Sequence, residues 1–355
     1  MIVFDNIVYR LQKAGGISVY WTEMCRRLIK DQTFEKLFIE DVFSKSNIFR
    51  QELDIPTINI YLKKNFLFKL SRYFDVNIHL KNKFIFHSSY FRLCSNKNAI
   101  NVTTVHDFIY EKHSRWGPKR LVHSFIKKRA IRKSDAIICV SESTKRDLIE
   151  YIPNVDIKKV YVIYLSVSNC FFPLTVLNFD TPFPKNKYLL FVGQRKGYKG
   201  FMFAVKVAKF YSINLLFVGG GSLSNAERLY LKSHLSKDSF IHVGNISSNR
   251  LNELYNNALC LFYPSTYEGF GLPLIEAQKA GCPVIAYRGS SIIEVVENSA
   301  LLIEEHTIEA VKKHIALLND PIKRAEIIEK GLINTKRFSW DQSYEKLISV
   351  YNKLL

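Results

Sequence analysis

Two glutamates, Glu268 and Glu276, flank a glycine-bearing loop in the second half of the sequence. The loop holds Gly269 and Gly271 and leads into Pro273, a residue type favoured in the first turn of a helix. Because the first N–H groups of a helix lack intrahelical acceptors, such a loop can bind a phosphate. A carboxylate at Glu276 can accept hydrogen bonds from the hydroxyls of a ribose. The segment predicts a nucleotide site; the alternative is a capping acid and a solvated helix glutamate.

Basic residues follow a predicted strand, Tyr188–Val192, in the segment GQRKGYKG. Arg195, Lys196 and Lys199 come close together behind Gly193. Cations at the carboxyl end of a strand are well placed to neutralise a diphosphate. We expect Arg195 and Lys199 to take this role, with Lys196 as a neighbour. The alternative is a solvated charged loop.

Two features of the first half could face the same ligand. Gly15 and Gly16 separate the first predicted strand from the first helix, and paired glycines allow a backbone to approach a ligand closely. An ordinary turn is an equally good explanation of that pair. His106 and Asp107 follow the apolar run Val102–Val105 at its carboxyl end, where α/β proteins form ligand sites. A structural histidine is the alternative there.

The elements that must position these residues follow a regular pattern. Short apolar runs alternate with amphipathic segments of helical length, which predicts parallel sheets covered by helices on both faces. The predicted strands are Ile2–Phe4, Leu37–Phe43, Lys83–His87, Val102–Val105, Ala136–Val140 and Val160–Ile163 in the first half, and Tyr188–Val192, Leu215–Val218, Phe240–Val243, Leu259–Tyr263, Val284–Ala286 and Leu301–Ile303 in the second.

The alternation breaks at Leu165–Lys187, a segment with three prolines and no clean period. We therefore expect two Rossmann-like domains, residues 1–172 and 173–338, and a last helix in residues 339–355. A chain of 355 residues is long enough for two such domains.

The net charge of +19 is concentrated in the first half. Residues 1–172 carry 29 Lys and Arg against 16 Asp and Glu, whereas residues 173–355 carry 22 against 16. A basic surface attracts nucleic acid, anionic lipid or phosphorylated ligands, although solubility or a lysine-rich genome would also explain it. No nucleic-acid-binding signature is visible, so we expect no nucleic-acid partner.

Three features of the sequence bear on location. No apolar run is long enough to span a membrane, and the N-terminus does not resemble a signal peptide. The six cysteines are scattered and predict reduced core residues, as in the cytoplasm.

Two basic stretches with interleaved aromatic residues fit the surface of an anionic membrane. The first is Tyr61–Phe74 and the second is Lys119–Lys133; ordinary helices packed on the core are the alternative. In the first stretch the predicted membrane-facing residues are Lys63, Lys64, Phe66, Phe68, Lys69 and Arg72.

The segment from Glu268 to Glu276 resembles the E-x7-E donor signature of family-4 retaining glycosyltransferases, which have the GT-B fold. The residues that follow also match: Ala277, Gly281, Pro283 and Val284. This resemblance implies that Glu276 holds the ribose of a nucleotide sugar and that Glu268 approaches the donor sugar. The loop backbone implied to face the diphosphate is that of Gly269, Phe270, Gly271 and Leu272.

The resemblance covers nearly the whole chain and assigns other roles. Arg195 and Lys199 are similar to the family's phosphate clamp, and Gly15 and Gly16 to its second phosphate-facing loop. His106 is similar to the histidine that faces the donor sugar. The fold implied is two domains facing across a cleft, with the last helix crossing back to the first domain. The linker lacks the family's usual Asn-Gly turn, so the position of the hinge is not predicted.

The implied reaction moves a hexose, with mannose favoured, from a nucleoside diphosphate sugar to a saccharide acceptor with retention. The similarity is to bacterial enzymes of O-antigen and capsule assembly, so a lipid-linked acceptor at the cytoplasmic face of the inner membrane is expected. No Asp-x-Asp pair occurs in the sequence, and we expect neither a metal nor another cofactor.

Two other enzyme classes compete with this interpretation. A nucleotide-sugar epimerase shares the two-domain fold but lacks this E-x7-E context. A nicotinamide oxidoreductase would need G-x-G-x-x-G at Gly219–Leu223, where the sequence reads GGGSL.

Overall fold

The computed structural model describes residues 1–63, 71–113, 117–175 and 182–355. The chain forms two compact units. The first comprises Met1–Ser166 together with Ser339–Leu355, and the second comprises Val167–Phe338. The boundary lies at 166/167, slightly before the expected boundary at 172/173.

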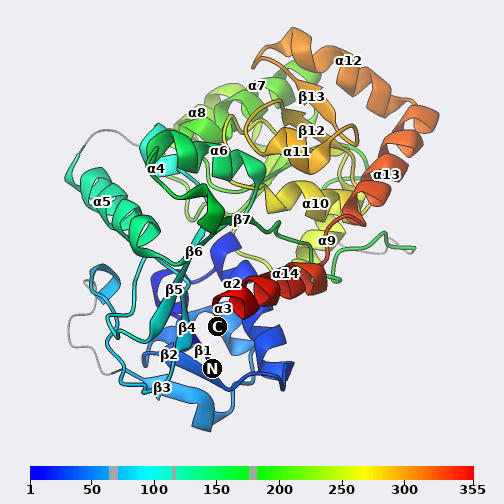
Figure 1. The fold of residues 1–355 in the computed structure, drawn as a ribbon. Coiled ribbons are helices and arrows are strands. Elements are labelled where there is room, and N and C mark those ends of the chain that lie inside the picture. The colour runs from blue at the N-terminus through cyan, green and yellow to red at the C-terminus, as the bar shows by residue number, and fades with distance from the viewer. Residues whose placement is uncertain (64–70, 114–116, 176–181) are drawn as a thin grey trace. The chain divides into compact units, whose positions relative to one another are not determined.

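The first unit is a seven-stranded parallel sheet in the order β3-β2-β1-β4-β5-β6-β7 (Figure 1). The strands are β1 (Ile2–Asp5), β2 (Lys36–Glu40), β3 (Ile60–Leu62), β4 (Phe84–Ser88), β5 (Ala99–Val105), β6 (Ala136–Cys139) and β7 (Val160–Val162). The helices are α1 (Val8–Leu11), α2 (Gly16–Lys30), α3 (Ile48–Gln51), α4 (Ile109–His113), α5 (Pro118–Lys133), α6 (Glu142–Tyr151) and α14 (Trp340–Leu354).

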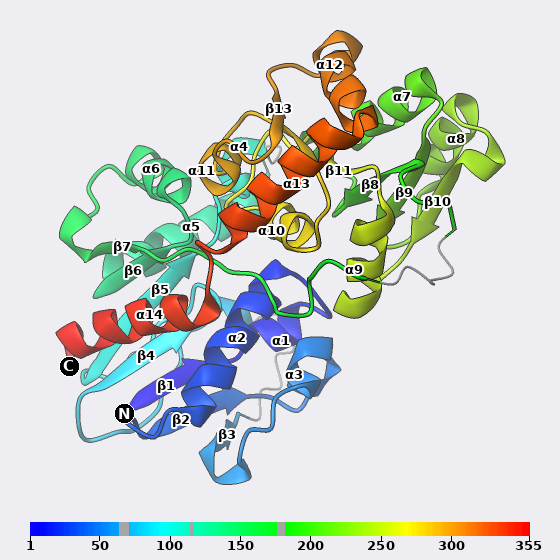
Figure 2. The same ribbon diagram turned by 90° about the vertical axis from the view of Figure 1, so that its right-hand side faces the viewer.

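The last helix, α14, belongs to this first unit and lies alongside α2 (Figure 2). Arg27 of α2 donates from Nε to the Asp341 carboxylate at 2.7 Å, and the Tyr344 hydroxyl donates to Asp31 at 2.9 Å. Apolar residues on the buried faces of α14, among them Leu347 and Tyr351, complete the contact with the core.

The second unit is a six-stranded parallel sheet in the order β10-β9-β8-β11-β12-β13. Its strands are β8 (Tyr188–Val192), β9 (Asn214–Val218), β10 (Phe240–Val243), β11 (Cys260–Tyr263), β12 (Val284–Tyr287) and β13 (Leu301–Ile303). Its helices are α7 (Phe201–Tyr211), α8 (Asn225–His234), α9 (Ser248–Asn257), α10 (Leu272–Lys279), α11 (Ile292–Val296), α12 (Ile308–Asn319) and α13 (Pro321–Thr335).

Both sheets reverse their strand order once, as in doubly wound α/β folds. The reversal lies between β1 and β4 in the first unit and between β8 and β11 in the second. Ligands of such folds bind outside the carboxyl ends of the strands at the reversal. The topology thus places one candidate ligand site in each unit, and the predicted α/β, Rossmann-like fold class is confirmed.

One strand was not predicted. Ile60–Leu62 forms β3 at the sheet edge, paired in parallel with β2, and overlaps the start of the stretch predicted as a basic amphipathic helix from Tyr61 to Phe74. Ser71–Tyr73 is a single 3-10 turn. The prediction of one helix over this stretch is therefore wrong at both ends, and its middle, residues 64–70, lies outside the described residues.

Candidate active site

In the second unit, the loops that follow β8 and β11 pack against each other. The 3-10 turn Gly197–Lys199 ends at Gly200, whose φ is +70°. A Cβ atom added to Gly200 would lie 2.4 Å from the Pro264 carbonyl oxygen, so only glycine allows the turn to approach β11 this closely. As a result, the Lys199 side chain reaches the loop that carries Glu268.

Lys199 and Glu268 form an ion pair at the reversal point of the sheet. Lys199 Nζ lies 2.5 Å from Glu268 Oε1, and Glu268 is only 7% exposed. The Glu268 N–H donates to the Ser290 hydroxyl at 2.8 Å, and the Ser291 hydroxyl donates to the Glu268 carbonyl at 2.9 Å. The two serine hydroxyls thus fix the backbone of Glu268, and Lys199 pairs with its carboxylate.

Glu276 lies on α10, directly after this loop. Gly271 precedes the helix with a φ of +97°, a conformation that favours glycine. The Tyr255 hydroxyl donates to Glu276 Oε2 at 3.1 Å. Burial raises the pKa of Glu276 to about 7, while this hydrogen bond acts in the opposite direction. A carboxyl group that is short of hydrogen-bond donors is well suited to accept them from ribose hydroxyls.

Arg195 has different partners from those expected of a phosphate clamp. Its buried guanidinium donates from Nε to Glu227 at 2.8 Å and forms an ion pair with it. Its Nη atoms donate to the backbone carbonyls of Gly219, Gly220, Gly221 and Ser222. Arg195 therefore holds the glycine-rich loop after β9, and phosphate contact by its Nη atoms would require some of these bonds to be released.

A cavity of about 460 Å³ opens beside that loop and was not predicted. It is lined by Gly221, Ser222, Leu223, Arg228, His242, Gly244 and Asn245. The run of three glycines was the available signal, because each has a positive φ and so shapes a loop that other residues rarely form.

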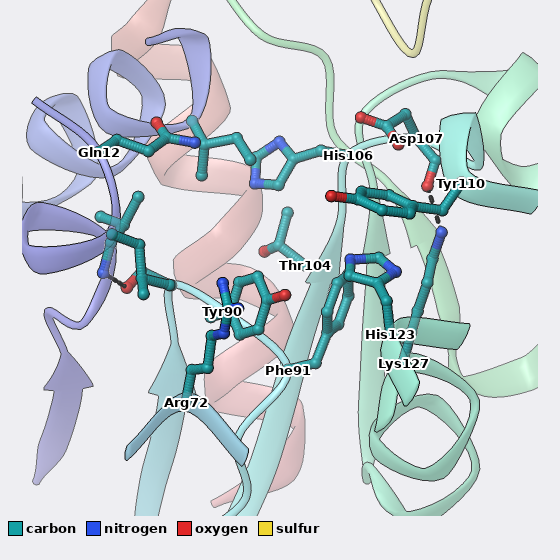
Figure 3. A pocket seen from close by; sticks show the side chains of 14 residues that line it. Gln12, Arg72, Tyr90, Phe91, Thr104, His106, Asp107, Tyr110, His123 and Lys127 are labelled. Carbon is teal, nitrogen blue, oxygen red and sulfur yellow. Dashed lines mark hydrogen bonds between the residues drawn. The ribbon is translucent and has the colours of Figure 1, made fainter. Parts of the chain in front are cut away.

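In the first unit, a cavity of about 220 Å³ lies beyond the carboxyl ends of β4 and β5 (Figure 3). It is lined by Val8, Leu11, Gln12, Ile17, Arg72, Ser89, Tyr90, Phe91, Thr104, His106, Asp107, Tyr110, His123 and Lys127. Three of the residues singled out from the sequence, Arg72, His106 and Asp107, are among them.

His106 is a neutral, half-buried histidine of this cavity. Burial, assisted by the Lys127 charge, lowers the pKa of His106 to about 3. Its ring meets the Tyr20 ring edge to face, with centroids 5.3 Å apart. A neutral imidazole can accept or donate one hydrogen bond at a sugar hydroxyl without adding charge.

Lys127 fixes the loop that follows His106. Its side chain is 1% exposed, and its ammonium pairs with Glu111 at 3.0 Å and lies 3.6 Å from the centroid of the Phe108 ring. It also donates to the Asp107 carbonyl. Burying a charge is tolerated only with such partners, so Lys127 ties α5 to the loop carrying His106 and Asp107. The sequence signal that was missed is the i, i+4 spacing of His123 and Lys127, which places both side chains on one face of α5.

Gly15 and Gly16 lie at the start of α2, and the short helix α1 stands between them and β1, so they do not directly follow the first strand as expected. Gly15 is the N-cap residue, no side chain caps this end of the helix, and a Cβ at Gly15 would lie 2.7 Å from the Gln12 amide oxygen. The Asn47 side chain donates to the Gln12 carbonyl at 2.8 Å and fixes the preceding loop. The uncapped N–H groups of a helix of this length can receive an anion.

The residues predicted to face a membrane are placed differently. Arg72 lines the cavity of Figure 3, and its Nη2 donates to the Tyr73 hydroxyl at 2.7 Å, so its assignment to a membrane surface is wrong. Lys63 is half-buried and lines a small cavity beside Asp5 and Arg92, and burial lowers its pKa. The other four, Lys64, Phe66, Phe68 and Lys69, lie outside the described residues.

Comparison with known proteins defines the class. Residues 14–168 match the model Glycosyltransferase Family 4, and residues 177–334 match Glycosyl transferases group 1. Together with two doubly wound sheets and the E-x7-E loop, these matches show that the chain belongs to this family of GT-B-fold glycosyltransferases.

Two of the relatives are named as O-antigen chain mannosyltransferases. The chain is 26% identical over 268 residues to O-antigen chain mannosyltransferase B of Escherichia coli, covering 71% of this chain and 70% of the relative. It is 31% identical over 228 residues to O-antigen chain mannosyltransferase RfbU of Salmonella typhimurium, covering 62% of each.

Solved structures share the fold at low identity. The structure of WaaG, described as a glycosyltransferase involved in lipopolysaccharide biosynthesis, matches 99% of both chains with a TM-score of 0.73 and 13% identity. Anabaena HepE in complex with UDP-glucose matches 99% of both chains with a TM-score of 0.72 and 13% identity.

Proposed function

We propose that this glycosyltransferase transfers a hexose from a nucleoside diphosphate sugar to a saccharide acceptor, with retention of anomeric configuration and without a metal. The observation that carries the proposal is the pairing of Lys199 with Glu268 beside the loop that leads to Glu276. The cation, the carboxylates and the N-terminal end of α10 surround the reversal point of the second sheet, where α/β folds bind nucleotides.

The chemical demand of the reaction is charge stabilisation. The nucleoside diphosphate leaves with developing negative charge on its phosphate oxygens. Lys199 and the backbone N–H groups of Gly269–Leu272 supply fixed positive potential for that charge. Glu276 accepts hydrogen bonds from the ribose and so fixes the orientation of the leaving group.

The first unit supplies the acceptor side. The cavity around His106 offers a neutral imidazole and the Asp107 carboxylate to sugar hydroxyls. Retention follows from attack on the face from which the diphosphate departs, with a donor phosphate oxygen taking the acceptor proton. The carboxylate of Glu268, paired with Lys199, then acts near the donor sugar rather than as a nucleophile.

The names of the relatives favour mannose as the sugar and bacterial O-antigen or lipopolysaccharide assembly as the pathway. In such a pathway the acceptor is a lipid-linked saccharide at the cytoplasmic face of the inner membrane. No helix within the described part of the chain is both long and apolar enough to cross a membrane.

Peripheral attachment through the two basic stretches remains part of the proposal, and α5 of the second stretch gives it the clearest support. Three large apolar side chains of α5 are exposed: Leu121 at 55%, Val122 at 45% and Phe125 at 69%. Basic residues follow on the same helix, including the exposed Arg132. Exposed apolar groups beside cations are the combination that binds an anionic bilayer surface.

A thermal-shift panel of GDP-, UDP- and dTDP-sugars tests the proposal, because a ligand that binds only the folded state raises the unfolding temperature. One nucleotide class is expected to stabilise the protein. Lys199→Met should abolish that shift, whereas the matched change Lys206→Met, on the exposed face of α7, should keep it. If no nucleotide sugar shifts the transition, or if both variants respond as wild type, the donor site is misassigned.

A further inference from the structure

We infer that the cavity of the first unit binds the phosphate group of a phosphorylated acceptor, with Arg72 as its main ligand. This inference rests on the proposed function, because it assigns the acceptor side of that reaction. The chemistry named is a phosphate ester, carried either by a sugar phosphate or by a lipid diphosphate.

The Arg72 guanidinium lines the cavity with unused donor capacity. Its Nε is buried and has no hydrogen-bond partner within the described residues. Its Nη2 donates to Tyr73, and the guanidinium carbon lies 4.8 Å from the centroid of the Tyr73 ring. No carboxylate pairs with it among the described residues, and the segment 64–70, which precedes it, reads KNFLFKL and contains no acid.

A cation in this position lowers the stability of the protein unless an anion binds to it. A buried donor without an acceptor costs on the order of 1–3 kcal/mol, and more for a charged group. The planar guanidinium fits the oxygens of a phosphate with two parallel hydrogen bonds. An oxyanion in the cavity would satisfy Arg72 where the protein itself does not.

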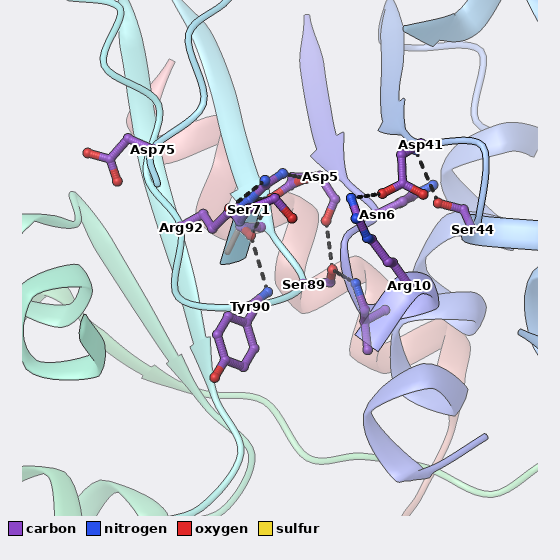
Figure 4. A network of polar contacts seen from close by, with 12 residues as sticks. Asp5, Asn6, Arg10, Asp41, Ser44, Ser71, Asp75, Ser89, Tyr90 and Arg92 are labelled. Atoms are coloured by element: carbon purple, nitrogen blue, oxygen red, sulfur yellow. Dashed lines mark hydrogen bonds and ion pairs between the residues drawn. The ribbon is translucent and has the colours of Figure 1, made fainter. Parts of the chain in front are cut away.

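The turn that carries Arg72 is anchored through Ser71, which lies in the polar network around Arg92 and Asp5 (Figure 4). Arg92 donates from Nη1 to the Ser71 carbonyl at 3.2 Å and is itself paired with the buried Asp5 carboxylate. On the other side, Arg129 of α5 pairs with Asp75. These contacts anchor the backbone on both sides of Arg72, and the bond to Tyr73 orients its guanidinium.

Two further groups that line the same cavity can donate to an oxyanion. The Tyr90 hydroxyl projects into the cavity near Arg72 (Figure 3), and burial raises the pKa of Tyr90 to about 12, which keeps its proton available for donation. His123 Nδ1 is buried and has no hydrogen-bond partner in the described part of the chain. Burial and the nearby Lys127 charge lower the pKa of His123 to about 4, so it is neutral and can donate one hydrogen bond.

The cavity has a second polar end. Asp107 and His106 lie across the cavity from Arg72 (Figure 3). The one carboxylate among the lining residues therefore does not neutralise Arg72, and Asp107 Oδ1 accepts the Ile109 N–H at 3.0 Å. An acceptor bound with its phosphate at Arg72 would extend its sugar hydroxyls toward His106.

Calorimetric titration of the full chain tests the inference, with the donor site first saturated by the nucleoside diphosphate that stabilises the protein. The probes form two matched pairs: glucose 1-phosphate with methyl glucoside, and decyl diphosphoglucose with decyl glucoside. The first pair represents a phosphorylated sugar and the second a lipid carrier. We expect at least one phosphorylated probe to bind tighter than its neutral partner by about tenfold or more.

Arg72→Gln should remove that preference, and Arg72→Lys, which keeps the charge but not the planar fork, should retain part of it. Arg146→Gln, an exposed arginine on α6, is the matched control and should behave as wild type. Equal binding of phosphorylated and neutral probes by wild type would overturn the inference, as would a preference unchanged in both Arg72 variants.

Binding of the nucleoside diphosphate is recorded in the same experiment. If wild type does not bind the nucleoside diphosphate, the proposed function is contradicted. If it binds the nucleoside diphosphate but shows no preference for phosphorylated probes, only the acceptor site is contradicted. The unfolding temperatures of the variants show whether each one is folded. If Arg72→Gln does not fold, the phosphate preference of Arg72→Lys tests the inference.

Discussion

Replacing Glu276 by Gln should have opposite effects on stability and on nucleotide binding. Glu276 is held in a site that raises its pKa to about 7, because burial disfavours the carboxylate. The same carboxylate is the proposed acceptor for the ribose hydroxyls. Without a ligand, the buried carboxylate therefore lowers the stability of the folded protein. Hydrogen bonds donated by the ribose stabilise the charged carboxylate.

The magnitude follows from the shift in pKa. In the unfolded chain the pKa of Glu276 is the ordinary 4.5, against about 7 in the folded protein. Between these two values the unfolded state has lost the proton that the folded state keeps, so wild-type stability falls as the pH rises. A difference of this size corresponds to roughly 3 kcal/mol. Gln carries no charge and loses nothing over this range.

The assay is denaturant unfolding of both proteins between pH 4 and pH 9. The free energy of unfolding of Glu276→Gln, relative to wild type, should rise from pH 4.5 to pH 7 and then level off. Nucleoside diphosphate affinity at pH 8 should fall by about 1–3 kcal/mol, the value of a hydrogen bond to a charged group. Glu329→Gln, an exposed glutamate of α13, is the control. A pH-independent stability difference, or unchanged nucleotide affinity, would refute the assignment.

Three other predictions concern metal, membrane and loop geometry. Activity should persist in excess EDTA, and loss that Mn²⁺ or Mg²⁺ restores would contradict metal independence. Changing Leu121, Val122 and Phe125 together to Ser should lower co-sedimentation with phosphatidylglycerol vesicles. Ile322→Ser, an exposed apolar control, should not lower it. Equal vesicle binding by all proteins would exclude α5 as the membrane-binding element. Gly200→Ala should destabilise the protein by about 1–2 kcal/mol because of the positive φ of Gly200 alone, and it should weaken nucleotide binding. Thermal unfolding measures the first effect and calorimetry the second. Wild-type values in both would show that the loop tolerates a side chain.

The local features of the fold could be predicted from the sequence because their causes are local. Buried parallel strands are continuous apolar runs, and all twelve predicted runs correspond to strands. The strand β3 was missed because an edge strand is short and exposed on one side, so its residues resemble a polar surface segment.

The partners of charged side chains could not be predicted, because they come from distant parts of the chain. Arg195 follows a strand as a phosphate ligand would, yet it pairs with Glu227 of α8. Arg72 belongs to a basic stretch by sequence and to a cavity by structure, through Arg92 and the buried Asp5. Sequence spacing does not encode these long-range pairings.

The central claim is transfer of a hexose with retention, and the stereochemistry of the product tests it most directly. The protein is incubated in EDTA with the α-linked nucleotide sugar that stabilises it, labelled with ¹³C in the sugar, and with a saccharide acceptor. Nuclear magnetic resonance of the product should show the labelled sugar joined to the acceptor through an α-linkage. A β-linked product, or an epimerised nucleotide sugar formed without any acceptor-linked label, would contradict the account.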